Sequence, residues 1–285
     1  MTKRAGVIGH PLGHSISPAI FQAAFAAAGV DATYEAWDTE PELLEGRVNS
    51  LRGADFLGAN VTIPHKQAVV PLIDGTSELA AKAGAVNTIV HSDGKLIGHN
   101  TDVPGFARSL KDDAGFDAKG KRAVLLGSGG AARAVALALI DAGASVIYVV
   151  ARQPRKIDAM VLALKPLTQP GTTITWAYYG DGSYLRAVVE ADLVVNCTPV
   201  GTAGSPFAGQ SPVAAELLQP ATTVFDLVYN PAETPLLAAA KARGARAVGG
   251  LGMLVYQAAE AFKLWTGQDA DIAAMFDAAK AALAV

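Results

Sequence analysis

Short runs of apolar residues alternate with longer stretches in which apolar residues recur at helical spacing. In the first part of the chain, the runs Ala5–Gly9, Thr33–Trp37 and Phe56–Thr62 predict strands, and 19–28 and 42–51 predict helices. Strands that alternate with helices of this length are typical of βα units. The pattern therefore predicts a parallel sheet in this part.

The alternation becomes more regular after Lys121. Strands are predicted at 122–126, 145–151, 173–177, 193–196 and 223–226, and helices between them at 131–142, 155–165 and 184–190. This is the pattern of a doubly wound, dinucleotide-binding sheet. Two further helical patterns, 253–264 and 272–283, are followed by no predicted strand, so we expect them to fold back onto the N-terminal part.

The pattern as a whole predicts an α/β protein of two domains. An N-terminal α/β domain, expected to bind substrate, would comprise residues 1–101 and 252–285, and a Rossmann-type doubly wound domain residues 102–251. The length agrees, because 285 residues suit two cores and domains typically run ~50–200 residues. Gly249, Gly250 and Gly252 permit a sharp change of direction where the chain would return.

Composition narrows the classes of function. Hydrophobic residues make up 51% of the chain and charged residues 17%, which favours a compact globule over disorder. The net charge of −3 gives no reason to expect binding to nucleic acid or to a membrane surface. No apolar run is long enough for a signal sequence or a membrane span. The single cysteine, Cys197, permits no intrachain disulfide, and we expect a cytoplasmic enzyme.

A glycine-rich turn follows the predicted strand 122–126 and opens the next helix. Its residues are Gly127, Ser128, Gly129, Gly130 and Ala131. Small residues there let backbone N–H groups approach a pyrophosphate at the positive end of a helix. The turn therefore predicts a dinucleotide site. The structural alternative is a turn that only packs a helix against its strand.

The residues after the second strand of this half favour NADP over NAD. In NAD-binding versions an acidic residue there binds the ribose 2′-hydroxyl, whereas here Arg152, Arg155 and Lys156 follow the strand and no acid does. A guanidinium can stack on adenine and bond a 2′-phosphate in a planar fork. We expect Arg152 and Lys156 to contribute, although a solvated first helical turn would also account for Arg155 and Lys156.

The candidate proton-transfer residues precede the nucleotide loop. Lys66 is predicted in the first turn of a helix begun by Pro64, where the helix dipole opposes a cation, so a purely structural lysine would be an odd choice. Asn87 and Asp102 fall at ends of predicted strands, where ligand clefts form in α/β sheets. A lysine and a carboxylate upstream of a nucleotide loop suggest proton transfer coupled to a cofactor. The structural alternative for Asp102 is an N-cap of the next helix.

Two serines near the N-terminus form a candidate seat for a carboxylate. The pattern places Ser17 as an N-cap and Pro18 at the first helical position. Two hydroxyls at a helix N-terminus suit a carboxylate. Capping accounts for Ser17 but not for Ser15.

Taken in order, the motifs along the whole chain resemble those of the shikimate dehydrogenase family. They are His14-Ser15-x-Ser17-Pro18, Asn60-Val61-Thr62-x-Pro64-x-Lys66, Gly84-Ala85-Val86-Asn87-Thr88, Asn100-Thr101-Asp102, Gly127-x-Gly129-Gly130-Ala131, Asn196-x-Thr198-Pro199-x-Gly201, Asp226-x-x-Tyr229-Asn230-Pro231 and Gly252-Met253-Leu254-x-x-Gln257. The resemblance implies reversible, NADP-dependent reduction of 3-dehydroshikimate to shikimate. Lys66 and Asp102 match the catalytic pair.

The resemblance also implies the residues of the binding sites. Those matched to substrate contacts are Ser15, Ser17, Thr62, Asn87, Tyr229 and Gln257. Those matched to the cofactor cleft, besides the glycine turn and its cations, are Thr198, Val200, Gly250 and Met253. We expect no metal ion. Ala151-Arg152-Gln153 stands where the family usually has Asn-Arg-Thr, which keeps the arginine but removes two hydrogen-bonding side chains, so NADP preference is expected to be weaker.

Two other functions stay open. A quinate or quinate/shikimate dehydrogenase would use NAD, and the missing acid and Ser17 weigh against it. A silent NADP-binding protein is expected to have lost Lys66 or Asp102, and neither is lost. Lys66 acts either as a true acid and base or mainly as a positioned charge, because the neighbouring carboxylate resists its deprotonation. Besides the small-molecule substrate, a second copy in a homodimer is an open prediction.

Overall fold

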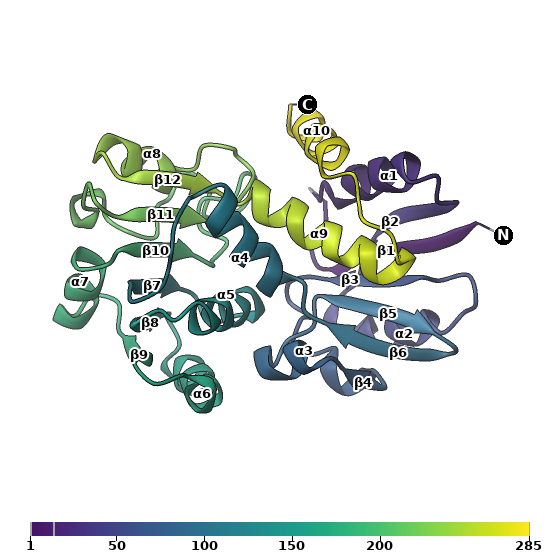
Figure 1. Ribbon diagram of the computed structural model, residues 1–285, viewed down its shortest axis with the longest axis horizontal. Coiled ribbons are helices and arrows are strands. Elements are labelled where there is room, and N and C mark those ends of the chain that lie inside the picture. Colours follow the sequence, from purple (N-terminus) through teal and green to yellow (C-terminus); the bar gives the residue numbers. More distant parts are fainter. Residues whose placement is uncertain (1, 14, 285) are drawn as a thin grey trace. The chain divides into compact units, whose positions relative to one another are not determined.

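The computed structural model describes residues 2–13 and 15–284. The chain forms two compact units, Met1–Gly105 with Val255–Val285, and Phe106–Leu254. The chain passes between them inside helices α4 (Asp102–Asp112) and α9 (Leu251–Thr266), which Figure 1 labels. The boundaries predicted from the sequence, 101/102 and 251/252, fall at the first turns of these two helices.

The first unit is built on a six-stranded sheet of order β2-β1-β3-β5-β6-β4. Its strands are β1 (Lys3–Gly9), β2 (Ala32–Asp38), β3 (Gly58–Val61), β4 (Gly75–Thr76), β5 (Thr88–Ser92) and β6 (Lys95–His99). Its shorter helices are α1 (Ser17–Ala27), α2 (Leu44–Ser50), α3 (Glu78–Ala83) and α10 (Ile272–Leu283), with 3₁₀ turns η1 (Pro41–Leu43) and η2 (Val70–Leu72).

The sheet of the first unit is mixed, so the prediction of a parallel sheet is wrong for this part. Strand β5 runs antiparallel to both β3 and β6. Asp93 (φ 51°) and Gly94 (φ 76°) both have left-handed backbones between β5 and β6. A two-residue turn of this kind joins antiparallel neighbours, whereas parallel strands need a long crossover.

The C-terminal segment packs on the first unit, as predicted. Helix α10 lies against α1, and the second half of α9 contributes aromatic rings to the core around α1. The Phe21 and Trp265 ring centres are 5.2 Å apart, and those of Phe25 and Phe262 are 5.7 Å apart. Trp265 also donates its Nε1–H to the carbonyl of Ile89 at 3.0 Å, which ties α9 to the sheet.

The second unit is a doubly wound, Rossmann-type sheet of six parallel strands, which confirms the predicted fold class. The strand order is β12-β11-β10-β7-β8-β9, so the winding reverses between β7 and β10. The strands are β7 (Arg122–Leu126), β8 (Val146–Val150), β9 (Thr173–Ala177), β10 (Leu193–Asn196), β11 (Thr223–Asp226) and β12 (Arg246–Gly249). The helices are α5 (Gly130–Asp141), α6 (Pro154–Leu164), α7 (Gly182–Val189) and α8 (Pro235–Ala242), with η3 (Lys165–Leu167) and η4 (Ala215–Leu217).

The last βα unit of this sheet, α8 with β12, was not predicted from the sequence. Its start signal is present, because the Thr234 hydroxyl accepts the Leu237 N–H at 3.2 Å and Pro235 follows the cap. Within residues 2–13 and 15–284, no helix is both long and apolar enough to span a membrane.

Candidate active site

One edge of the first sheet gathers most of the predicted substrate residues. Because β3 and β5 are antiparallel, with Asn60 opposite Thr88, the end of β3 lies beside the start of β5. Thr88 is in turn opposite His99, so the end of β6 lies there too. The segments that carry Thr62, Asn87 and Asp102 therefore leave the sheet at the same edge.

Lys66 lies in a series of turns, and the prediction that it occupies the first turn of a helix is wrong. A helix would pair the Lys66 carbonyl with the N–H of Val70, but this carbonyl accepts the Val86 N–H at 2.7 Å. Pro71, which has no N–H, removes the next helical bond. The bond to Val86 fixes Lys66 beside the segment that carries Asn87.

Lys66 and Asp102 form a buried ion pair. Lys66 Nζ donates to Asp102 Oδ2, and the two side chains are 13% and 5% exposed. Asn87 Nδ2 donates to the other carboxylate oxygen at 2.8 Å. Helix α4 begins at Asp102, so Asp102 is its first residue and does not hold the N-cap position; the Val103 N–H is bound by Asn100 Oδ1 at 3.3 Å. The N-cap alternative for Asp102 is therefore ruled out, and its carboxylate serves the side-chain cluster.

Asn87 connects the ion pair to Gln257 of α9. Asn87 Oδ1 accepts the Thr101 N–H at 2.7 Å, which leaves its Nδ2 to donate toward Asp102 and, at 3.2 Å, toward Gln257 Oε1. A Cβ on Gly105 would lie 2.8 Å from Gln257 Cβ, so only glycine lets α4 pass this close to α9. The structure thus brings Lys66, Asp102, Asn87 and Gln257 into one hydrogen-bonded cluster.

A second layer of polar side chains supports this cluster, and the sequence reasoning gave these residues no role. Asn60 Nδ2 donates to Thr88 Oγ1 at 3.1 Å, and Tyr34 donates its hydroxyl to Asn60 Oδ1 at 2.7 Å. Thr88 and Thr101 share a hydrogen bond of 3.1 Å between their hydroxyls. The available signal was a polar residue within an otherwise apolar strand, as at Asn60, because such a group is buried only with a partner.

The two N-terminal serines lie in the segment between β1 and α1. Helix α1 begins at Ser17 and its N-cap position is Ile16, so the prediction of Ser17 as N-cap is wrong by one residue. Ile16 already has helical backbone angles (φ −90°, ψ 0°), so the helix starts one residue earlier than predicted. Ser15 Oγ instead accepts the Ser17 N–H at 3.4 Å. In the part of the chain that is described, the hydroxyls of Ser17 and Thr62 have no partner and can bind a ligand; His14 lies outside it.

The glycine turn in the second unit has the geometry that a dinucleotide needs. Gly127 has φ +120°, and a Cβ there would lie 3.2 Å from the Cys197 carbonyl oxygen. Gly129 is the N-cap of α5 and offers no side chain to the first N–H groups of the helix. A Cβ on Gly129 would meet no described atom within 4 Å, so packing does not require glycine there. The free N–H groups and the open space fit a pyrophosphate.

Arg152 is the second residue after the end of β8 and is exposed. Its guanidinium carbon lies 5.8 Å from the centre of the Phe207 ring. None of the described residues accepts a hydrogen bond from this guanidinium, so it is available to a phosphate. Arg155 and Lys156 are exposed in the first turn of α6, as the solvated alternative expected.

The remaining cofactor residues follow strands β10, β11 and β12. Thr198 donates its hydroxyl to Asn196 Oδ1 at 2.6 Å and accepts the Val200 N–H at 3.2 Å. Burial raises the pKa of Tyr229, which follows β11. Met253 is buried in the first turn of α9.

Gly250 precedes α9 and Gly252 lies in its first turn, and both allow close packing; the sharp change of direction there stays a prediction. Neither Gly250 nor Gly252 has a left-handed backbone. A Cβ on Gly250 would overlap the Leu227 carbonyl oxygen, and one on Gly252 would overlap the Asp113 carboxylate. Glycine is needed at both positions because the backbone passes so close to its neighbours.

Comparison with known proteins identifies the family. The model of the shikimate dehydrogenase substrate binding domain matches residues 7–89, and that of the shikimate 5′-dehydrogenase C-terminal domain matches residues 250–280. Over 274 residues, 96% of this chain and 91% of the relative, the chain is 45% identical to a shikimate dehydrogenase (NADP(+)) of Moorella thermoacetica. The chain belongs to the shikimate dehydrogenase family.

Solved structures in and around the family share the fold. Shikimate 5-dehydrogenase from Thermus thermophilus, in complex with NADP(H) and shikimate, is 40% identical with a TM-score of 0.86, over 99% of this chain and 100% of that one. Quinate dehydrogenase from Corynebacterium glutamicum, in complex with NAD, is 32% identical with a TM-score of 0.87, over 98% and 99%. The fold thus serves two related substrates and both cofactors.

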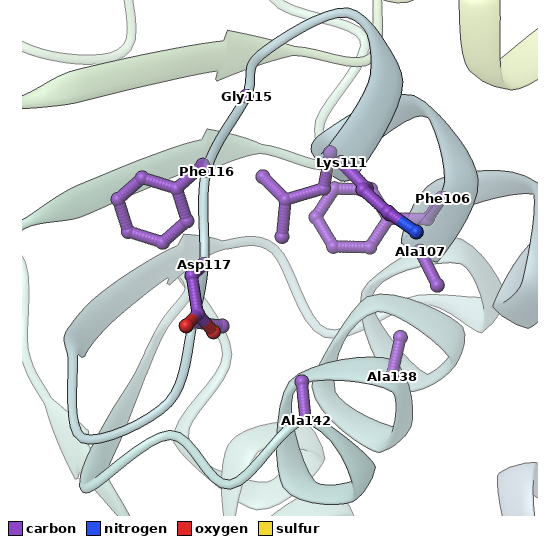
Figure 2. Close-up of a pocket in the computed structure, with 10 residues that line it drawn as sticks. Phe106, Ala107, Lys111, Gly115, Phe116, Asp117, Ala138 and Ala142 are labelled. Atoms are coloured by element: carbon purple, nitrogen blue, oxygen red, sulfur yellow. The ribbon is translucent and has the colours of Figure 1, made fainter.

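A hollow of about 550 Å³ lies in the second unit. Figure 2 shows Phe106 and Phe116 at its walls, with Lys111 and Asp117 as its charged groups. No predicted site residue lines it. In the described residues we also find no group of three or more His, Cys, Asp or Glu side chains that could hold a metal ion.

Proposed function

We propose that this chain catalyses the reversible, NADP-dependent reduction of 3-dehydroshikimate to shikimate, with Lys66 and Asp102 as its catalytic pair. The observation that carries the proposal is the buried ion pair, in which the carboxylate is held by Lys66 on one oxygen and by Asn87 on the other. The names of relatives that match more than nine-tenths of this chain support the substrate and the cofactor.

The cofactor supplies a hydride to the substrate carbonyl carbon. The carbonyl oxygen gains negative charge and needs a proton. The Lys66 ammonium can stabilise the charged oxygen and then donate a proton to it. In the reverse direction Lys66 accepts the proton of the substrate hydroxyl. Asp102, fixed by Asn87, orients the ammonium and holds it at one place.

The other polar groups at the sheet edge position the substrate. We assign the hydroxyls of Ser15 and Ser17 to the substrate carboxylate, since a hydroxyl can donate to a carboxylate at the start of a helix. Thr62, Asn87 and Gln257 are assigned to the ring hydroxyls. Tyr229 belongs to the second unit, and its assignment to substrate rests on the match of its motif to the family.

The residues of the second unit are assigned along the length of the cofactor. The backbone N–H groups of Gly127, Ser128, Gly129, Gly130 and Ala131 hold the pyrophosphate. Arg152, helped by Lys156, binds the adenosine 2′-phosphate. The residues assigned to the nicotinamide end are Thr198, Val200, Gly250 and Met253.

Replacement of Lys66 tests the catalytic assignment. We expect Lys66→Ala to lower turnover by ~10²–10⁴-fold, the usual contribution of general acid–base catalysis, and to change the Michaelis constant for shikimate much less. Lys82→Ala, which removes an exposed lysine of the same unit, is the matched control and is expected to leave turnover unchanged. Near-normal turnover of Lys66→Ala would rule out the assignment.

A quinate dehydrogenase that uses NAD is the second candidate, and the 32% identical quinate enzyme supports it. The absence of an acid from residues 151–156 disfavours it. Initial rates with shikimate and with quinate, each with NADP and with NAD, separate the two, because our proposal requires shikimate with NADP to be the fastest combination. Binding of NADP with no turnover of either substrate would instead identify a silent paralogue.

We also infer a homodimer and a cytoplasmic location. Leu162 and Trp176 are 75% and 45% exposed beside the edge strand β9, and a second copy is a suitable cover for such an apolar surface. Light scattering of the purified protein tests the dimer, and Trp176→Lys is expected to shift the mass toward that of one chain.

A further inference from the structure

A buried carboxylate with no catalytic assignment lies at the end of β11. Asp226 is 0% exposed and stands opposite Asn196, also 0% exposed, at the end of the parallel strand β10. Burial raises the pKa of Asp226, and hydrogen bonds from neighbouring groups oppose the rise. In the described part of the chain no cation pairs with it. A buried unpaired carboxylate is costly, so packing alone does not explain Asp226.

The carboxylate orients the side chain of Asn196. A carboxylate only accepts hydrogen bonds, so the amide must present Nδ2 to Asp226 Oδ1, at 2.9 Å. Asn196 Oδ1 then faces the next turn, where it accepts the Thr198 N–H at 3.0 Å and the Thr198 hydroxyl at 2.6 Å. Because the Thr198 hydroxyl donates its proton to Asn196, its oxygen can accept the Val200 N–H, at 3.2 Å. A chain of hydrogen bonds that begins at Asp226 thus fixes the segment that carries Thr198 and Val200.

The same carboxylate also holds the segment after β11. Asp226 Oδ1 accepts the Val228 N–H at 3.1 Å, one residue before Tyr229. The Val228 carbonyl in turn accepts the Gly250 N–H at 3.3 Å. The two segments are joined directly, because the Ala203 N–H donates to the Asn230 carbonyl at 2.9 Å.

We propose that Asp226 is a positioning residue that sets the nicotinamide end of the cofactor site. It acts through Asn196 on the segment of Thr198 and Val200, and through the Val228 backbone on the segment of Tyr229 and Gly250. This rests on the proposed function, in which those four residues surround the reacting end of the cofactor and substrate. Arg152, at the adenosine end, lies outside the network.

The test is Asp226→Ala, which removes both oxygens that accept hydrogen bonds from Asn196, Val228 and Thr234. A misplacement of about 1 Å can cost ~10²-fold in rate, and we expect kcat/KM with NADP and shikimate to fall by ~10–100-fold. The inhibition constant of adenosine 2′,5′-bisphosphate, a fragment that carries only the adenosine end, is expected to stay unchanged. General damage to the fold would not lower kcat/KM while it left the inhibition constant of this fragment unchanged.

Two further variants complete the test. Thr234→Val removes the third hydrogen bond of Asp226, 2.6 Å to the Thr234 hydroxyl, together with the cap of α8, but none of the hydrogen bonds that join Asp226 to Asn196 and Val228. It is expected to lower the melting temperature and leave kcat/KM near normal. Asn196→Ala removes only the link from Asp226 to the segment of Thr198 and Val200. It is expected to give the same loss of kcat/KM with an unchanged inhibition constant, even if Asp226→Ala fails to fold.

Several outcomes would overturn the proposal. They are normal kcat/KM in Asp226→Ala or Asn196→Ala, an equal kinetic loss in Thr234→Val, or a parallel loss of affinity for adenosine 2′,5′-bisphosphate. The proposed function fails separately, if the unaltered protein shows no NADP-dependent oxidation of shikimate.

Discussion

Replacement of Arg152 is the sharpest test of cofactor choice. Its guanidinium is exposed, rests near the Phe207 ring at 5.8 Å and has no acceptor among the described side chains. Arg152→Ala therefore breaks no internal ion pair, and its effect on stability is expected to be small. Any large change in cofactor binding must come from the lost contact with the cofactor itself.

The expected magnitude follows from the chemistry of that contact. A hydrogen bond to a charged group contributes roughly 1.5–3 kcal/mol, which corresponds to ~10–150-fold in affinity. Because Arg152 is exposed and screened by solvent, we expect the lower part of this range, a ~10–50-fold rise in the Michaelis constant for NADP. NAD has no 2′-phosphate, so its constant is expected to change much less.

Steady-state kinetics with each cofactor at saturating shikimate measures both constants. Arg186→Ala is the matched control, because it removes the same charge from an exposed position on α7. Phe207→Leu, which removes the ring beside Arg152 but keeps the cation, is expected to give a smaller rise for NADP. Equal changes for NADP and NAD in Arg152→Ala would refute the phosphate assignment.

Three other predictions follow from buried groups. In Gly105→Ala the new Cβ would lie 2.8 Å from Gln257 Cβ; we expect a loss of ~1–3 kcal/mol in unfolding free energy and a raised Michaelis constant for shikimate, and an unchanged constant would contradict the role of Gln257. Burial, and then the charge of Asp226, raises the pKa of the Cys197 thiol, so iodoacetamide should label this partly exposed thiol much more slowly at neutral pH in the folded protein than in the unfolded one, as mass spectrometry would show. Burial raises the pKa of Tyr34 well above its usual value of 10.0; the stability it contributes is complete below about pH 10 and is lost as the pH rises further, so urea midpoints at alkaline pH should fall less in Tyr34→Phe.

Local pattern was sufficient to predict most of the second unit. Most strands there are short apolar runs with a turn and a helix after them; β10 is the exception, since only the 3₁₀ turn η4 separates it from β11. The glycine turn is likewise a local signal, because Gly127 and Gly129 are needed where the backbone is left-handed or must stay open.

The errors arose where distant segments decide the local structure. Lys66 lies outside a helix because the N–H of Val86, twenty residues away along the chain, takes its carbonyl. The Lys66–Asp102 pairing was expected from chemistry, but its support by Asn60 and Tyr34 depends on strands that only the folded sheet brings together. The antiparallel pairing of β5 and β6 is the one error with a local cause, since the Asp93-Gly94 dipeptide between them is a recognised turn signal.

The return of the C-terminal segment bears on how the protein is made. Residues 106–254 are one uninterrupted stretch, so the second unit is fully synthesised before α10 exists. The first unit is not, because Phe262 and Trp265 complete the aromatic cluster around Phe21 and Phe25. Until Phe262 and Trp265 leave the ribosome, the Phe21 and Phe25 rings lack their cover, and exposed apolar surface of this kind is what chaperones bind. The first unit therefore completes its core only after the whole second unit has been synthesised.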